Sequence, residues 1–232
     1  MTRELTGGAA VGTTFNRGLE IYKKNFVPLL LATLLAFFVG GLSCGICTAP
    51  LLCGVYAMIL KAMRDGNAQL KAGDVFQGFQ KFVPAFVGCL VWGAICHVVV
   101  GVLVCIPVVG WIAIIPAQAA LSAATVWSLL LVTDQEASVG EAISVPLKLL
   151  GDKRFWSIVL VSFVAGLIGG LGVIACGIGL FATIPFAFCM VAAAYEEAYG
   201  AAAPVAVEPP AAEPPAAEPP AAEPPASETP AS

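Results

Sequence analysis

The sequence predicts an all-α membrane protein with about six transmembrane helices. We expect them to form three hairpins, each preceded by an amphipathic interfacial helix. Three observations support this prediction. Of the 232 residues, 59% are hydrophobic and only 11% are charged, whereas about a quarter of a typical soluble domain is charged. The mean hydropathy is +0.92, and the charged residues form short blocks between long charge-free windows.

The same composition argues against several classes of protein. The formal net charge is −4, and residues 204–232 contain acidic side chains but no basic one. The rest of the chain is nearly balanced in charge, so it offers no basic surface to nucleic acid. The apolar composition also disfavours a soluble enzyme and a coiled coil.

The charge-free windows set the expected spans. They cover residues 25–60, 82–133 and 155–195. Each window is too long for one spanning helix of about 20 residues and is suited to two. We therefore expect spans near residues 26–43, 47–64, 83–105, 110–132, 155–174 and 178–196.

Each window contains glycine and proline near its middle. These residues are the strongest local breakers of helices. We therefore assign Pro50, Pro116 and Pro185 as helix-break positions. Broken helices at these points could line a cavity inside the membrane.

The distribution of Lys and Arg predicts the orientation. All of them lie outside the charge-free windows and, in the six-span arrangement, on one face. The positive-inside rule makes this face cytoplasmic. We expect a multi-pass protein of a bacterial inner membrane with cytoplasmic N- and C-termini. A re-entrant hairpin would have the same sidedness and stays an open alternative. The first 26 residues do not show the pattern of a cleavable signal peptide.

The chain contains an internal repeat. The segment FVPLLLATLLAFFVGG, which begins at Phe26, aligns without a gap with FWSIVLVSFVAGLIGG, which begins at Phe155. We place the repeats near residues 13–64, 73–133 and 138–197. The predicted domains are a flexible N-terminus (1–12), a helical membrane domain (13–198) and a disordered tail rich in Pro, Ala and Glu (199–232).

An amphipathic segment precedes each expected hairpin. Ser138 and Glu141 have the spacing of a capping box, and Asp74 is positioned to cap the second segment. These segments could lie on the cytoplasmic leaflet as interfacial helices or extend the spans into the cytoplasm. The first two apolar stripes contain Phe15, Leu19, Tyr22 and Phe26, and then Phe76, Phe79 and Phe82.

Small residues recur at every fourth position in the first span of each hairpin. Such stripes allow helix backbones to approach closely in lipid. We therefore predict that these three helices meet in the interior of the bundle. The stripes are Ala32, Ala36 and Gly40; Cys89, Gly93, His97 and Gly101; and Ser162, Gly166 and Gly170.

His97 is the single histidine of the chain and lies within an expected span. An ionisable residue inside a membrane is a candidate functional site. Together with Gly93 and Gly101 it forms a candidate intramembrane polar or packing site. Packing between helices is the favoured interpretation, and a ligand or proton site is the alternative.

Cys44 and Cys47 form the one cysteine pair with redox spacing. The equivalent segment of the third repeat, Cys176-Gly-Ile-Gly179, lacks the second cysteine. This difference favours a role in the shape of the turn. A structural disulfide or a catalytic dithiol stays an alternative.

No motif of a hydrolase, a metalloprotease or a nucleotide-binding loop is present. We predict no catalytic residue, no cofactor and no metal site. The leading hypothesis is a non-enzymatic membrane scaffold or accessory subunit. A channel or transporter for a small or apolar solute is the alternative, and a membrane thiol oxidoreductase is a remote one. Expected partners are the lipid bilayer, other membrane proteins and a cytoplasmic partner of the tail. The sequence does not predict an oligomeric state.

Several of these motifs resemble those of a broad group of uncharacterised bacterial six-helix integral membrane proteins. That group is similar to the membrane domain found beside some glycerophosphoryl diester phosphodiesterases. The resemblance covers roughly residues 13–197 and implies a six-helix fold without an established activity. Its motifs are Asn25-Phe26, Pro50 with Gly54, Asp74-Val-Phe-Gln-Gly-Phe79, and Cys176-Gly-Ile-Gly179 followed by Thr183-Ile-Pro185.

Overall fold

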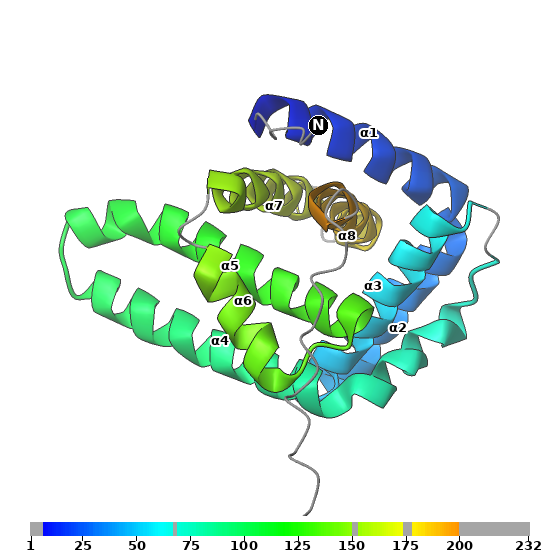
Figure 1. Ribbon diagram of the computed structural model, residues 1–232, viewed down its shortest axis with the longest axis horizontal. Helices are drawn as coiled ribbons and strands as arrows, with labels where there is room; N and C mark the ends of the chain where they lie inside the picture. The colour runs from blue at the N-terminus through cyan, green and yellow to red at the C-terminus, as the bar shows by residue number, and fades with distance from the viewer. Residues whose placement is uncertain (1–6, 67–68, 150–152, 174–177, 200–232) are drawn as a thin grey trace, which may run out of the picture.

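The computed structural model describes residues 7–66, 69–149, 153–173 and 178–199 (Figure 1). These residues form eight α-helices and one 3₁₀ helix, and they contain no β-strand, so the predicted all-α class is confirmed. Residues 200–232 of the predicted tail lie outside the described part. The elements are α1 (Gly7–Lys24), α2 (Phe26–Leu42), α3 (Thr48–Arg64), η1 (Ala72–Lys81), α4 (Phe82–Val104), α5 (Val109–Gln135), α6 (Val139–Leu149), α7 (Lys153–Leu171) and α8 (Ile178–Tyr199).

Several of these helices are candidates for crossing a membrane. The segment Ala72–Val104, the helix Val109–Gln135 and the segment Gly179–Ala198 are long and apolar enough. A fourth candidate arises if α1 and α2, which meet at 93°, form one bent span. All six expected apolar segments are helical, with bounds that differ from the prediction by a few residues. Their arrangement as six spans stays a prediction.

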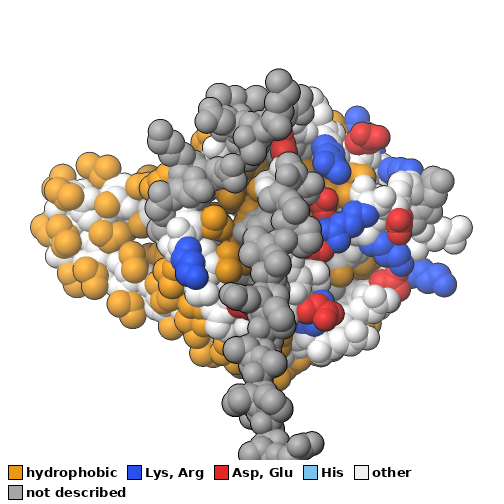
Figure 2. Space-filling model, viewed as in Figure 1, with side chains coloured by type: hydrophobic (Ala, Val, Ile, Leu, Met, Phe, Trp, Pro, Cys, Tyr) orange, Lys and Arg blue, Asp and Glu red, His pale blue; other side chains and the backbone are white. Residues whose placement is uncertain are grey.

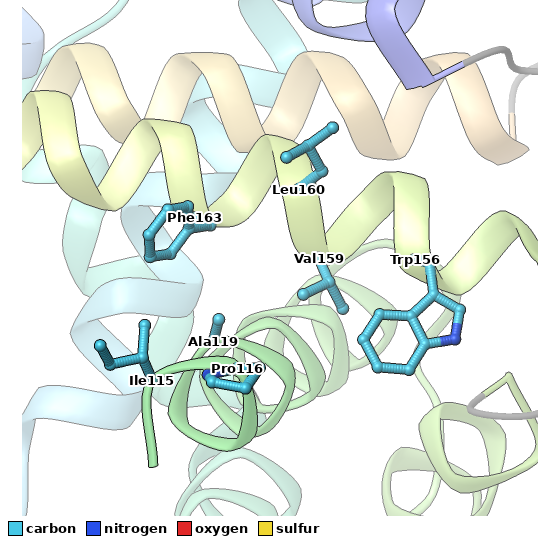
Figure 3. Close-up of a pocket in the computed structure, with 7 residues that line it drawn as sticks. All are labelled: Ile115, Pro116, Ala119, Trp156, Val159, Leu160 and Phe163. Atoms are coloured by element: carbon cyan, nitrogen blue, oxygen red, sulfur yellow. The ribbon is translucent and has the colours of Figure 1, made fainter. Parts of the chain in front are cut away.

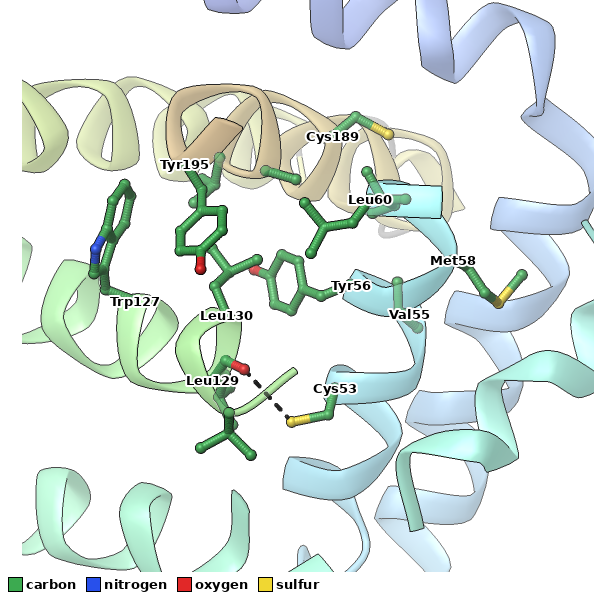
Figure 4. Packing of buried hydrophobic residues seen from close by; sticks show 14 of the residues in the cluster. Cys53, Val55, Tyr56, Met58, Leu60, Trp127, Leu129, Leu130, Cys189 and Tyr195 are labelled. Carbon is green, nitrogen blue, oxygen red and sulfur yellow. Dashed lines mark hydrogen bonds between the residues drawn. The ribbon is translucent and has the colours of Figure 1, made fainter. Parts of the chain in front are cut away.

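Helix α3 lies in the buried core and contacts α2, η1, α5 and α8. Most of its residues are buried, and Tyr56 is 1% exposed. Figure 4 shows this side chain between α3, α5 and α8, close to Leu130 and Tyr195. The Cys53 thiol points to the carbonyl oxygen of Leu129 at 3.8 Å.

Two glycines allow η1 to pack against the backbone of α3. A methyl group at Gly54 would overlap the carbonyl of Val75, and one at Gly78 would overlap the carbonyl of Pro50. Only residues without a Cβ permit this approach. The close contact buries Val75 completely.

We expected the first helices of the hairpins, α2, α4 and α7, to meet in the interior. That prediction is wrong. Among the described residues these three helices make no extended contact with one another, whereas α3, α5 and α8 are in mutual contact. The second helix of each predicted pair therefore lies in the interior, and the first helices pack against it without meeting one another.

The orientation of the small residues explains the difference. A Cβ at Gly93, Gly101, Gly166 or Gly170 would meet no neighbouring atom within 4 Å, so these parts of α4 and α7 face outward. On α2 the stripe is buried, but there Gly40 packs against Thr48 of α3. Small residues permit close packing without selecting the partner helix.

The outer halves of α4 and α5 form an arm that projects from the rest of the molecule (Figure 1). Most side chains on its visible face are hydrophobic (Figure 2). The turn Cys105–Val108 joins the two helices at the end of the arm. Exposed apolar residues of the arm include Val98 (66%), Val102 (58%), Val109 (69%), Trp111 (67%) and Ile112 (72%).

The three amphipathic segments pack partly against other helices. On α1, Gly18 lies close to the backbone of α8 at Met190. The centroids of the Phe15 and Phe186 rings are 5.3 Å apart. The buried Ala142 of α6 faces α4, where Trp92 donates to its carbonyl oxygen at 3.4 Å. These buried faces contact protein, and the location of the segments at a membrane surface stays a prediction.

The two capping predictions have different outcomes. The capping box at Ser138 is confirmed, because the Ser138 N–H and hydroxyl both donate to Glu141 Oε2 at 2.8 Å. The N-cap prediction for Asp74 is wrong. Lys71 occupies that position, and Asp74 accepts the Lys71 N–H from within η1 at 3.3 Å.

The assignment of three prolines as helix breaks is also wrong. Pro116 and Pro185 lie inside α5 and α8. Pro50 lies in the first turn of α3, where a backbone N–H has no partner within the helix in any case. The chain instead turns at Ser43–Cys47 and at Cys105–Val108. A proline inside a helix removes one hydrogen bond, and packing against other helices can compensate for that loss.

Candidate functional site

A charged cluster joins the last turns of α3, α5 and α8. Arg64 Nη1 lies 2.6 Å from Asp134 Oδ1, and Arg64 Nη2 lies 2.7 Å from Glu196 Oε1. The side chains of Asp134 and Glu196 are only 15% and 12% exposed, whereas that of Arg64 is 50% exposed. One guanidinium therefore holds two largely buried carboxylates, a geometry for which Arg is suited.

Polar residues beside the cluster extend it. The Tyr195 hydroxyl donates to Asp134 Oδ2 at 3.2 Å, and Gln135 Nε2 donates to that hydroxyl at 3.2 Å. The Tyr195 ring packs edge-on against the buried Trp127, with 5.2 Å between the two ring centroids. The cluster thus connects charged helix ends to the apolar core.

Other charged groups lie at the ends of neighbouring helices. Lys81, which ends η1, pairs with Glu136 at 3.3 Å and donates to the carbonyl oxygen of Thr133 at 2.8 Å. On the face shown in Figure 2, most charged side chains gather to the right, away from the apolar arm. This separation agrees with the confinement of charge in the sequence.

The charged cluster was not predicted as a unit from the sequence. Arg64, Asp134 and Glu196 belong to three separate blocks of charged residues in the sequence. One signal was available: each residue lies at the end of the second expected span of a repeat or within two residues after it. The contacts among α3, α5 and α8 bring these positions together.

His97 lies on the exposed side of α4 and not in the bundle interior. Its Nδ1 lies 2.7 Å from the carbonyl oxygen of Gly93, one turn earlier in the same helix. Gly93 and Gly101 flank it on the open side of the helix. The expectation that His97 packs inside the bundle is therefore wrong, because α4 buries its opposite face through Ala85, Gly88 and Trp92.

Cys44 and Cys47 lie in the turn between α2 and α3, and both thiols are free. Cys44 and Gly45 have positive φ angles of 52° and 88°. The Ser43 hydroxyl accepts the Cys47 N–H at 3.1 Å and closes the turn. These features are those of a tight turn. In the described residues Cys44 and Cys47 form no disulfide.

A groove runs between α5 and α7 (Figure 3). It has a volume of about 390 Å³, and its lining side chains are all apolar. They are Ile115, Pro116, Ala119, Trp156, Val159, Leu160 and Phe163. Pro116, one of the expected break positions, thus forms part of a cavity wall without breaking its helix.

A second pocket of about 330 Å³ continues along the same two helices. Its lining adds the polar side chains Gln118, Ser122 and Ser162. Ser162 Oγ is buried and has no hydrogen-bond partner in the described part of the chain. Ser162 belongs to a predicted packing stripe, whereas Gln118 was not among the predicted site residues.

The described residues contain no group of three His, Cys, Asp or Glu side chains that could hold a metal ion. The seven described cysteines are free, and Cys176 lies outside the described residues.

Comparison with known proteins adds no relative. No protein-family model, no curated protein sequence and no solved structure matches this chain. The resemblance to six-helix bacterial membrane proteins therefore stays a prediction.

Proposed function

We propose that this chain is an integral protein of a bacterial inner membrane and serves there as a scaffold or accessory subunit. Six helical segments embed it, and its N- and C-termini face the cytoplasm. Its role is to hold other components by its membrane surface and its acidic tail, without catalysing a reaction.

The exposure of the arm carries this proposal. The most apolar window of the candidate span that includes α4 has a mean hydropathy of 2.4. Only 11% of this window is buried inside the protein. So large an apolar surface is unfavourable in water and favours a membrane or a protein partner. The continuous helices of the arm also satisfy their own backbone groups, as a bilayer requires.

The charge distribution supports the orientation. The charged cluster and the Lys81–Glu136 pair lie at helix ends that the positive-inside rule would place in the cytoplasm. The turns Ser43–Cys47, between α2 and α3, and Cys105–Val108, between α4 and α5, carry no charge. They are suited to the opposite side of the membrane or to a position within it.

The turn cysteines offer a direct test of the topology. Variants that retain only Cys44 or only Cys105, both exposed, would be treated with a membrane-impermeant maleimide in intact cells. A matched variant would carry its single cysteine at Glu136, on the charged side. We expect labelling of Cys44 and Cys105 from outside, and labelling of Glu136→Cys only after permeabilisation. Protection of both turns would contradict the six-span arrangement.

The scaffold role has a separate test. The intact chain, purified in mild detergent, should elute with a second polypeptide in a fixed ratio. A chain that ends at residue 203 should insert normally but lose a cytoplasmic partner. Elution of the intact chain without any stoichiometric partner would contradict the scaffold role while leaving the topology untouched.

A further inference from the structure

We draw no further inference here: the strongest candidate, the outward face of α4 that carries Gly93, His97 and Gly101, is an unpartnered stripe of small residues around an exposed histidine, and nothing in the described part of the chain shows what covers it.

Discussion

The arm of α4 and α5 and the central helix α3 are both apolar, but they bury very different fractions of their residues. Helix α3 has eleven buried residues among its 17, whereas α4 has three among its 23. Yet α4 belongs to a candidate membrane span, and α3 is not among the three long candidates. Hydropathy therefore does not predict which helix occupies the protein interior.

Residue size and polarity explain the contrast between these regions. Helix α3 presents Gly54 to η1 and the bulky Tyr56 to α8, and its end carries Arg64 into the charged cluster. The outer part of α4 presents valines and glycines that find no partner in the described chain. Specific packing and ion pairing select the interior, because aliphatic surface is equally well accommodated by lipid.

The largest expected effect comes from filling the contact between α3 and η1. Gly54→Leu should destabilise the fold by about 3 kcal/mol or more, because its side chain would overlap a carbonyl that cannot move freely. Thermal unfolding in detergent, followed by the loss of the monodisperse peak, measures the change.

The matched control is Gly101→Leu on the arm. There the new side chain meets open space, and replacing Gly within a helix is favourable by about 0.5–1 kcal/mol. We expect an unchanged or slightly higher unfolding temperature. Equal losses at both positions would contradict the distinction between body and arm.

A smaller effect is expected at the charged cluster. Arg64→Ala leaves Asp134 and Glu196 without their cation at 15% and 12% exposure. Removing one partner of a buried pair costs about 3–5 kcal/mol. Because Arg64 is half exposed, we expect about 1–3 kcal/mol after solvent screening. Urea or thermal unfolding in detergent would measure the difference.

Lys61→Ala on the same helix is the control for Arg64→Ala. Lys61 is exposed, so its replacement should change stability by no more than about 0.5 kcal/mol. If both variants lost the same stability, the cluster would contribute no more than a surface charge.

The smallest effect concerns α6, which packs on the base of the arm. Hydrogen bonds from the Ser138 backbone and hydroxyl lower the pKa of Glu141 from its ordinary value of 4.5. A lowered pKa in the folded state stabilises the fold above pH 4.5, and this contribution is lost as the pH falls through the lowered pKa. Wild type should therefore unfold at a higher temperature than Glu141→Gln at neutral pH, by a small margin because the group is exposed. The two should converge at strongly acidic pH, and a constant gap would exclude this ionisation as the cause.

Much of the local structure was predictable. The charge-free windows predicted six apolar helical segments close to their observed bounds. The Ser138–Glu141 capping box was predicted from two residues, since its hydrogen bonds depend only on local spacing. Glycine and proline predicted the regions of the turns, although Pro116 and Pro185 themselves lie inside helices.

The candidate sites were less predictable. His97 was assigned to the interior because its stripe of small residues suggested packing, but a stripe does not specify which neighbour it faces. Arg64, Asp134 and Glu196 are far apart in the sequence and meet only because three helix ends converge. The groove likewise requires the crossing of α5 and α7, which separately show only apolar helices.

The sequence by itself determined the apolar composition, the helical segments and the separation of charge from the expected spans. These properties follow from residue type and from short-range spacing. Only the tertiary structure decided that α3, α5 and α8 form the interior, that His97 faces outward and that Ser162 lines a pocket. The physical reason is that apolar helices can pack in many ways, and the choice depends on close backbone contacts and ion pairs between distant residues.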